Sequence, residues 1–189
     1  MSFRPPARLL GLLLVACPAM AWSQPWEPYS WHLALEAGET QLDISKDNYR
    51  IDDSDTSLHL MAGYEITRNI NIVGGYMDLG RFATDLLVED EDGDMVVDDR
   101  RRTSVSAWTA HVEMHWSLLG FLHPNVGLGA ARWRLDMPDG QYDDTQDTAP
   151  MLRLGLGIDV APNSRLDVTV QEISRLNART AALGLRITF

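Results

Sequence analysis

The sequence predicts an all-β protein, an eight-stranded antiparallel up-and-down transmembrane β-barrel. Segments of about ten residues alternate apolar side chains with small or polar ones, as strands with two different faces do. Short turns and long acidic loops alternate between these segments, which is typical of barrels in an outer membrane. Helical periodicity is absent from the sequence after residue 21.

Eight segments carry the alternation. The predicted strands cover residues 31–42, 58–66, 70–79, 104–116, 122–135, 151–161, 165–173 and 179–189. In the fifth, Leu128 and Ala130 share one parity whereas Trp133 and Leu135 fall on the other. A β-bulge near Gly129 or Ala131 would bring these apolar side chains to one face, so a bulge is predicted there.

The three long loops, residues 43–57, 81–103 and 136–149, carry net charges of −3, −4 and −5 within a chain of net charge −11. An acidic chain is a poor partner for nucleic acid. The run from Glu89 to Asp94 is interpreted as a solvated loop, because an EF-hand register would place Val88 where a carboxylate is needed. Loose binding of divalent cations at the acidic loops is the alternative. The arginines at 100–102 fit either a lipid-phosphate contact or an interfacial anchor.

Residues 1–21 have the features of a cleaved secretory signal peptide, which leaves residues 22–189 as the barrel domain. Arg4 and Arg8 precede a short apolar stretch, and Ala19 and Ala21 form an A-x-A cleavage site. Lipidation at Cys17 is the alternative. Cys17 is the single cysteine, so the cleaved chain has no thiolate metal site, and we predict neither a metal centre nor a cofactor.

The polar faces of the strands are expected to line the barrel interior. They hold glycines and ions of both signs, and the chain has one lysine, Lys46, which does not fit the outer face of a soluble barrel. Buried ions must be paired, so a salt-bridge plug is predicted, with a gated small-solute path as the alternative. The predicted lumen charge network consists of Glu36, His111, Glu113, Arg153, Asp159, Arg165, Asp167 and Arg186.

Aromatic residues near the strand ends predict two girdles at the membrane surfaces. With a periplasmic N-terminus, one girdle contains Trp31, Tyr64, Trp116 and Phe189, and Tyr76 lies at the opposite end.

The chain resembles the small eight-stranded outer-membrane barrels typified by the OmpA transmembrane domain and OmpX. The resemblance covers roughly residues 29–189 and rests on Gly63-Tyr64, on Gly75-Tyr76 followed by residues 78–80, and on the closing residues 185–189. It implies a Gram-negative cell-envelope protein in contact with outer-membrane lipid and lipopolysaccharide, whose last strand is read by the barrel assembly machinery.

The predicted function is a structural or surface-interaction role without catalysis. A narrow, porin-like small-solute channel is one alternative. A lipid A-modifying enzyme is another, because His115 and Ser117 form an H-x-S pair that would place a base beside a hydroxyl on one strand face.

Overall fold

The structure is a computed structural model that describes residues 30–46, 49–89, 95–136 and 145–189, with side chains except at residues 46, 86–89 and 95–100. Its strands are β1 (Trp31–Lys46), β2 (Tyr49–Thr67), β3 (Ile70–Glu89), β4 (Met95–His115), β5 (Leu122–Asp136), β6 (Thr145–Ala161), β7 (Ser164–Ile173) and β8 (Ala178–Thr188). A 3-10 turn, η1 (Ser174–Leu176), connects the last two.

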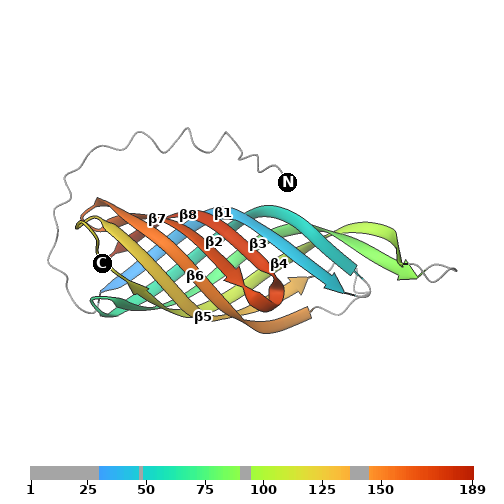
Figure 1. Ribbon diagram of the computed structural model, residues 1–189, viewed down its shortest axis with the longest axis horizontal. Coiled ribbons are helices and arrows are strands. Elements are labelled where there is room, and N and C mark those ends of the chain that lie inside the picture. Colours follow the sequence, from blue (N-terminus) through green and yellow to red (C-terminus); the bar gives the residue numbers. More distant parts are fainter. Residues whose placement is uncertain (1–29, 47–48, 90–94, 137–144) are drawn as a thin grey trace.

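The strands form a closed barrel in chain order, and every neighbouring pair is antiparallel (Figure 1). Strand β8 pairs with β1 from Ala178 opposite Leu42 to Thr188 opposite His32, which closes the sheet. The predicted fold class is therefore confirmed.

The two ends of the barrel differ. At the short-turn end, β2–β3, β4–β5 and β6–β7 are joined by brief connections, and the C-terminus lies there (Figure 1). At the other end, which we call the hairpin end, β3 and β4 extend well beyond the remaining strands (Figure 1). These two strands have 20 and 21 residues, whereas β7 and β8 have 10 and 11.

Much of the sequence assigned to long loops is strand. Residues 43–46 and 49–57 continue β1 and β2, residues 81–89 and 95–103 continue β3 and β4, and residues 145–149 begin β6. The loop prediction was wrong there because residues such as Asp43 and Asp52 are exposed while Ile44 and Ile51 point inward and are buried. Asp53 and Asp55 are half-buried and accept hydrogen bonds from the backbone of β3.

The predicted bulge in β5 is also wrong. Strand β5 pairs with β4 and with β6 without a register shift. Trp133 and Leu135 simply face the interior, with 7% and 0% of their surfaces exposed. Register shifts occur instead on β3, for example between Asp78 and Gly80.

An apolar belt surrounds the barrel nearer the short-turn end. Its side chains are 39–62% exposed. It consists of Leu33, Leu35, Leu58, Leu60, Ile72, Val112, Met114, Leu128, Leu152, Leu154, Leu156, Ile158, Val168, Val170, Leu183, Leu185 and Ile187. Behind it, the interior is rich in buried histidine, arginine and carboxylate side chains. Exposed apolar side chains over a polar interior are the arrangement of a protein surrounded by lipid. No helix among the described residues is long and apolar enough to cross a membrane.

Candidate functional site: a lumen in two layers

Inward-facing side chains fill the lumen in two layers. The ionic layer lies behind the apolar belt and contains most of the buried charged residues. Its members are His32, Glu36, His59, Asn71, His111, Glu113, His115, His123, Asn125, Arg153, Asp167, Thr169 and Arg186. The apolar layer lies toward the hairpin end. Its members are Leu42, Ile44, Ile51, Met77, Leu79, Phe82, Val105, Ala107, Ala131, Trp133, Leu135, Ala149, Met151, Ile173, Leu176 and Ala178.

Two forked ion pairs form the centre of the ionic layer. The Arg153 guanidinium donates through Nη1 to Glu36 Oε2 at 3.0 Å and through Nη2 to Glu36 Oε1. Arg186 donates through Nη1 and Nη2 to the two oxygens of Glu113 at 2.6 and 3.1 Å, and through Nε to Asp167 Oδ2 at 3.0 Å. Such bidentate pairs fix geometry as well as supplying strong hydrogen bonds.

The two pairs belong to one network. Arg153 Nε lies 3.8 Å from Glu113 Oε2. Thr169 donates its hydroxyl to Glu36 Oε2 at 3.3 Å, and Asn71 donates its amide to Glu113 Oε1 at 3.2 Å. These contacts connect strands on all sides of the barrel and cross-link its interior.

Glycines on neighbouring strands make room for the large side chains of the ionic layer. Gly184 lies opposite Glu36 in the β1–β8 ladder, and a Cβ there would overlap the Glu36 side chain. A Cβ at Gly63 would overlap the imidazole of His32. The small residues that the sequence places on the inner face are therefore required by the size of their neighbours.

A second, smaller cluster lies at the short-turn rim. Asp159 accepts a hydrogen bond from Arg165 Nε at 3.0 Å, and its other oxygen lies 2.7 Å from Nε2 of His123. Asp159 and Arg165 are only partly buried. The structure thus divides the residues of the predicted lumen network between this rim cluster and the central pairs.

The lumen contains more histidines than the sequence analysis assigned to it. All five histidines of the chain are buried in the interior, whereas the predicted network included only His111. The parity of each histidine within its strand was the available signal. His111 lies beside the central pairs, but neither of its ring nitrogens has a hydrogen-bond partner among the described residues. His59 is closer to the network, with Nδ1 3.6 Å from Glu36 Oε2.

The central network holds three carboxylates, Glu36, Glu113 and Asp167, and two guanidiniums, Arg153 and Arg186. Buried polar atoms without partners are costly unless water reaches them. We therefore expect ordered water around the histidines of the ionic layer.

The apolar layer packs inside the barrel on the hairpin side of the ionic layer. Phe82, Val105 and Leu135 are fully buried within it. The η1 turn contributes Leu176, which is also fully buried, and ends at Asn177 in the left-handed conformation with φ 49°. A hydrogen bond of 3.1 Å from Gln171 Nε2 to Met77 Sδ lies between the two layers.

The aromatic residues predicted for the girdles lie on the outer wall. Trp31 packs against Tyr64 with ring centroids 4.8 Å apart, near the short-turn end. Tyr76 packs against Trp108 at 5.2 Å, farther toward the hairpin end. Trp108 was missing from the predicted girdle although it is 67% exposed. Trp116 and Phe189, at the short-turn end, are also exposed.

The two residues of the H-x-S pair differ in burial. Strand β4 ends at His115, whose side chain is buried in the lumen, whereas Ser117 follows the strand and is exposed. The described residues contain no group of three or more histidine, cysteine or acidic side chains placed to hold a metal ion. The Glu89–Asp94 run lies largely outside the described residues.

No protein-family model and no curated protein matches the sequence. Solved structures do match. Neisserial surface protein A superposes with a TM-score of 0.58 and 16% identity, over 86% of this chain and 100% of that one. The N-terminal β-barrel domain of Pseudomonas aeruginosa OprF superposes with a TM-score of 0.53 and 15% identity, over 84% of this chain and 97% of that one. The outer membrane protein AlkL superposes with a TM-score of 0.53 and 16% identity, over 88% of this chain and 92% of that one.

The chain has the fold of the small eight-stranded outer-membrane β-barrels. The resemblance that the sequence suggests is therefore confirmed at the level of fold. At these identities the matches concern the fold alone, and function has to be argued from the lumen and the outer wall.

Proposed function

We propose that this protein is a closed outer-membrane barrel with a structural or surface-interaction role, which neither catalyses a reaction nor conducts solutes. The short-turn end faces the periplasm and the hairpin end faces the cell exterior, which is the usual orientation of such barrels. The proposal includes export through the signal peptide of residues 1–21 and insertion by the assembly machinery through β8.

The apolar layer is the observation that carries this proposal. A conducting pore needs a continuous polar path. Here the ionic layer is followed by packed apolar side chains such as Phe82, Trp133 and Leu135. The buried threonines at that level, Thr84 and Thr103, join their hydroxyls to each other at 2.7 Å. Re-pairing the arginines below would not open a path through these side chains.

The long hairpin supports a role at the cell surface. Strands β3 and β4 exceed β7 and β8 by about ten residues, which corresponds to roughly 33 Å of extended chain. A solved structure of Ail, named the attachment invasion locus protein of Yersinia pestis, superposes with a TM-score of 0.50 and 18% identity, over 86% of this chain and 100% of that one. Its name associates a barrel of this fold with attachment and invasion, which are functions at the cell surface.

Conductance in planar lipid bilayers tests the proposal. The purified protein should insert, shown by heat-modifiable migration on gels, and give no discrete current steps, while a known porin in the same bilayer gives them. Arg153→Met provides the matched variant, because it alters the ionic layer alone. Current steps in the wild type that change in size with Arg153→Met would place a solute path through the lumen and contradict the proposal.

A further inference from the structure

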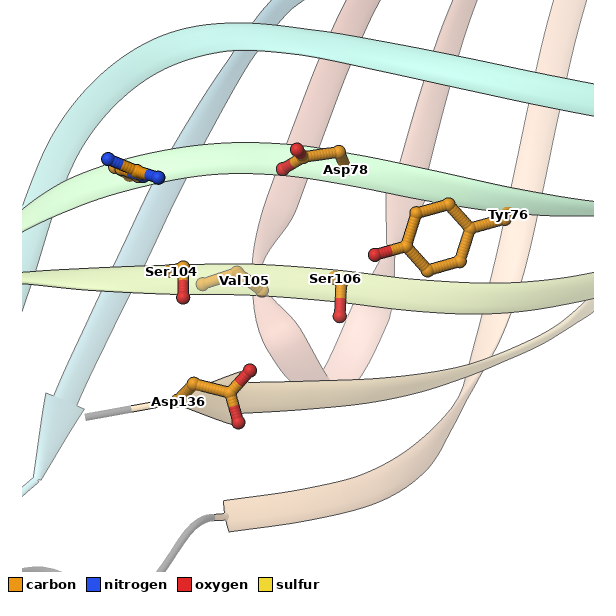
Figure 2. Close-up of a pocket in the computed structure, with 7 residues that line it drawn as sticks. Tyr76, Asp78, Ser104, Val105, Ser106 and Asp136 are labelled. Atoms are coloured by element: carbon orange, nitrogen blue, oxygen red, sulfur yellow. The ribbon is translucent and has the colours of Figure 1, made fainter. Parts of the chain in front are cut away.

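The outer wall carries a polar hollow of about 230 Å³ on β3, β4 and β5 (Figure 2). It lies outside the lumen, on the wall that carries the apolar belt. Its lining residues are Tyr76, Asp78, Arg81, Ser104, Val105, Ser106 and Asp136. The side chain of Val105 points into the lumen, so the polar side chains of the other six determine what the hollow can bind.

Strand register explains why these residues meet. Asp78 lies opposite Ser106 and Arg81 lies opposite Ser104 on β4, and Ser104 in turn lies opposite Asp136 on β5. The register shift between Asp78 and Gly80 lets both Asp78 and Arg81 face outward although they are three residues apart.

The bulge is held by backbone contacts and by a glycine. Gly80 has φ 112°, a conformation that favours glycine, and its N–H donates to Asp78 Oδ1 at 3.1 Å. The N–H of Arg81 donates to Asp55 Oδ2 at 2.6 Å. Asp78 and Arg81 are therefore positioned by the local backbone.

The hollow lies where the apolar belt ends. The outward residues on its short-turn side are Tyr76 and Trp108, which face each other across β3 and β4, and Ile72 and Val112 follow below them. On its other side Ala83 and Arg102 lie opposite each other on the outer face, with Asp136 and Arg134 beside them on β5. In a membrane this level is occupied by lipid headgroups, with acyl chains against the belt beneath.

The chemistry of the lining fits a neutral group rich in hydroxyls. Asp78 and Asp136 are acceptors, Arg81 is a donor, and the hydroxyls of Ser104 and Ser106 both donate and accept. Arg134, just outside the lining, pairs through Nε with Asp136 Oδ1 at 2.6 Å, so that Arg81 and Arg134 offset the two carboxylates of the lining, and Asp55 contacts the backbone of Arg81. Two carboxylates disfavour a bare phosphate, and the balance of charge disfavours a simple cation site.

We propose that this hollow binds a sugar ring in the headgroup of an outer-leaflet glycolipid, a partner assignment that rests on the proposed function. Its volume is below the roughly 300–1,000 Å³ of drug-sized pockets, which suits a single ring. The carboxylates and hydroxyls bond the sugar hydroxyls, and the Tyr76 ring forms the edge of the hollow nearest the belt (Figure 2). The acyl chains of the lipid lie along the belt below Tyr76 and Trp108.

Binding of a defined glycolipid by native mass spectrometry tests this assignment. The probes are lipid A carrying inner-core sugars, the same oligosaccharide without lipid, and phosphatidylethanolamine. Asp78→Asn should weaken glycolipid binding about tenfold, the effect of weakening one hydrogen bond to a charged group, and Ser106→Ala should weaken it less. Neither variant should alter binding of phosphatidylethanolamine, and the free oligosaccharide should bind more weakly than the glycolipid.

Glu39→Gln is the matched control, because Glu39 is an exposed, outward-facing carboxylate on β1 that does not line the hollow and is separated from β3 by β2. Each variant is checked for heat-modifiable migration, so that a folding defect is recognised. Equal affinities for Asp78→Asn and Glu39→Gln would overturn the assignment, as would free oligosaccharide binding as tightly as glycolipid. Glycolipid binding that EDTA abolishes and Ser106→Ala leaves unchanged would assign the hollow to a cation and also overturn it. Conductance decides the proposed function separately, since none of these variants alters the lumen.

Discussion

Each strand of this barrel has two parts with opposite polarity, and β5 shows the contrast within a few residues. Near the short-turn end Leu128 faces outward and Gly127 faces the ionic layer. Toward the hairpin end Arg134 faces outward and Leu135 faces the apolar layer. No register shift separates the two parts, so the backbone is continuous while the chemistry of its faces is exchanged.

The polarity of the inner and outer faces depends on whether lipid or water surrounds that part of the barrel wall. Where the outside is lipid, apolar side chains face outward and the interior can hold ions, provided that they are paired. Where the outside is water, burying apolar side chains in the lumen is favourable and polar ones face outward. The ionic layer is therefore stabilised by specific pairs, and the apolar layer by packing.

Disrupting the ionic layer should lower the free energy of unfolding more than any other change considered. Arg186→Met leaves Glu113 and Asp167 without the guanidinium that both contact, and an uncompensated buried charge costs about 3–5 kcal/mol. The free energy of unfolding in lipid vesicles, measured by urea titration, should fall by that amount. The control is Arg179→Met on the same strand, whose side chain is 74% exposed and pairs with Glu172 at 3.5 Å, and which should change it by at most about 1 kcal/mol. Similar losses for the two variants would mean that the ionic layer is not held by its pairs.

Truncating the apolar layer should cost somewhat less. Leu135→Ala creates a cavity in a packed interior, and the expected loss is about 3 kcal/mol in the same titration. Leu128→Ala removes the same atoms from the lipid-facing side of the same strand, where acyl chains fill the space, so its loss should be much smaller. If Leu128→Ala were the more damaging of the two, the assignment of the two faces of β5 would be reversed.

A charge on the outer wall tests the boundary between the two parts of a strand. Leu154 is 49% exposed within the belt on β6, and Leu154→Arg should cost about 2–4 kcal/mol if its level is near the bilayer midplane. Gln146→Arg, on the exposed outer face of the same strand toward the hairpin end, should cost at most about 1 kcal/mol, because it only removes an exposed hydrogen bond that Arg132 donates at 3.3 Å and adds a like charge in water. Unfolding in vesicles of defined thickness measures both, and equal tolerance would argue against a lipid-facing belt.

The sequence predicted the strand number, the closure and the inward direction of most luminal ions, because strand alternation depends only on the two-residue period. It did not reveal the apolar layer. Trp133 and Leu135 were interpreted as lipid-facing after a bulge, on the assumption that apolar side chains face outward along the whole strand. That assumption fails toward the hairpin end, where buried Ile44 lies between outward Asp43 and Ser45 in a segment assigned to a loop.

The pairing of the luminal ions was harder to predict from the sequence than their inward direction. Parity places Glu36 and Arg153 on the inner face, but they lie 117 positions apart and meet across the lumen, at a distance that depends on the tilt and stagger of the strands. The outer hollow depends on the register shift at Asp78, and no turn residue or proline marks that shift in the sequence apart from Gly80 itself.

The smallest effect is expected at Ser117, which lies outside both layers, whereas its neighbour His115 belongs to the ionic layer. Ser117 is exposed outside β4 and His115 has its ring in the lumen, so Ser117→Ala should change the free energy of unfolding by no more than about 0.5 kcal/mol. Cells that express the wild type, Ser117→Ala or no barrel should contain the same lipid A by mass spectrometry, because a base that is separated from the hydroxyl cannot activate it. Lipid A that loses an acyl chain only when Ser117 is present would show that the ring and the hydroxyl meet in the membrane, and that the short-turn end of the barrel is a catalytic site.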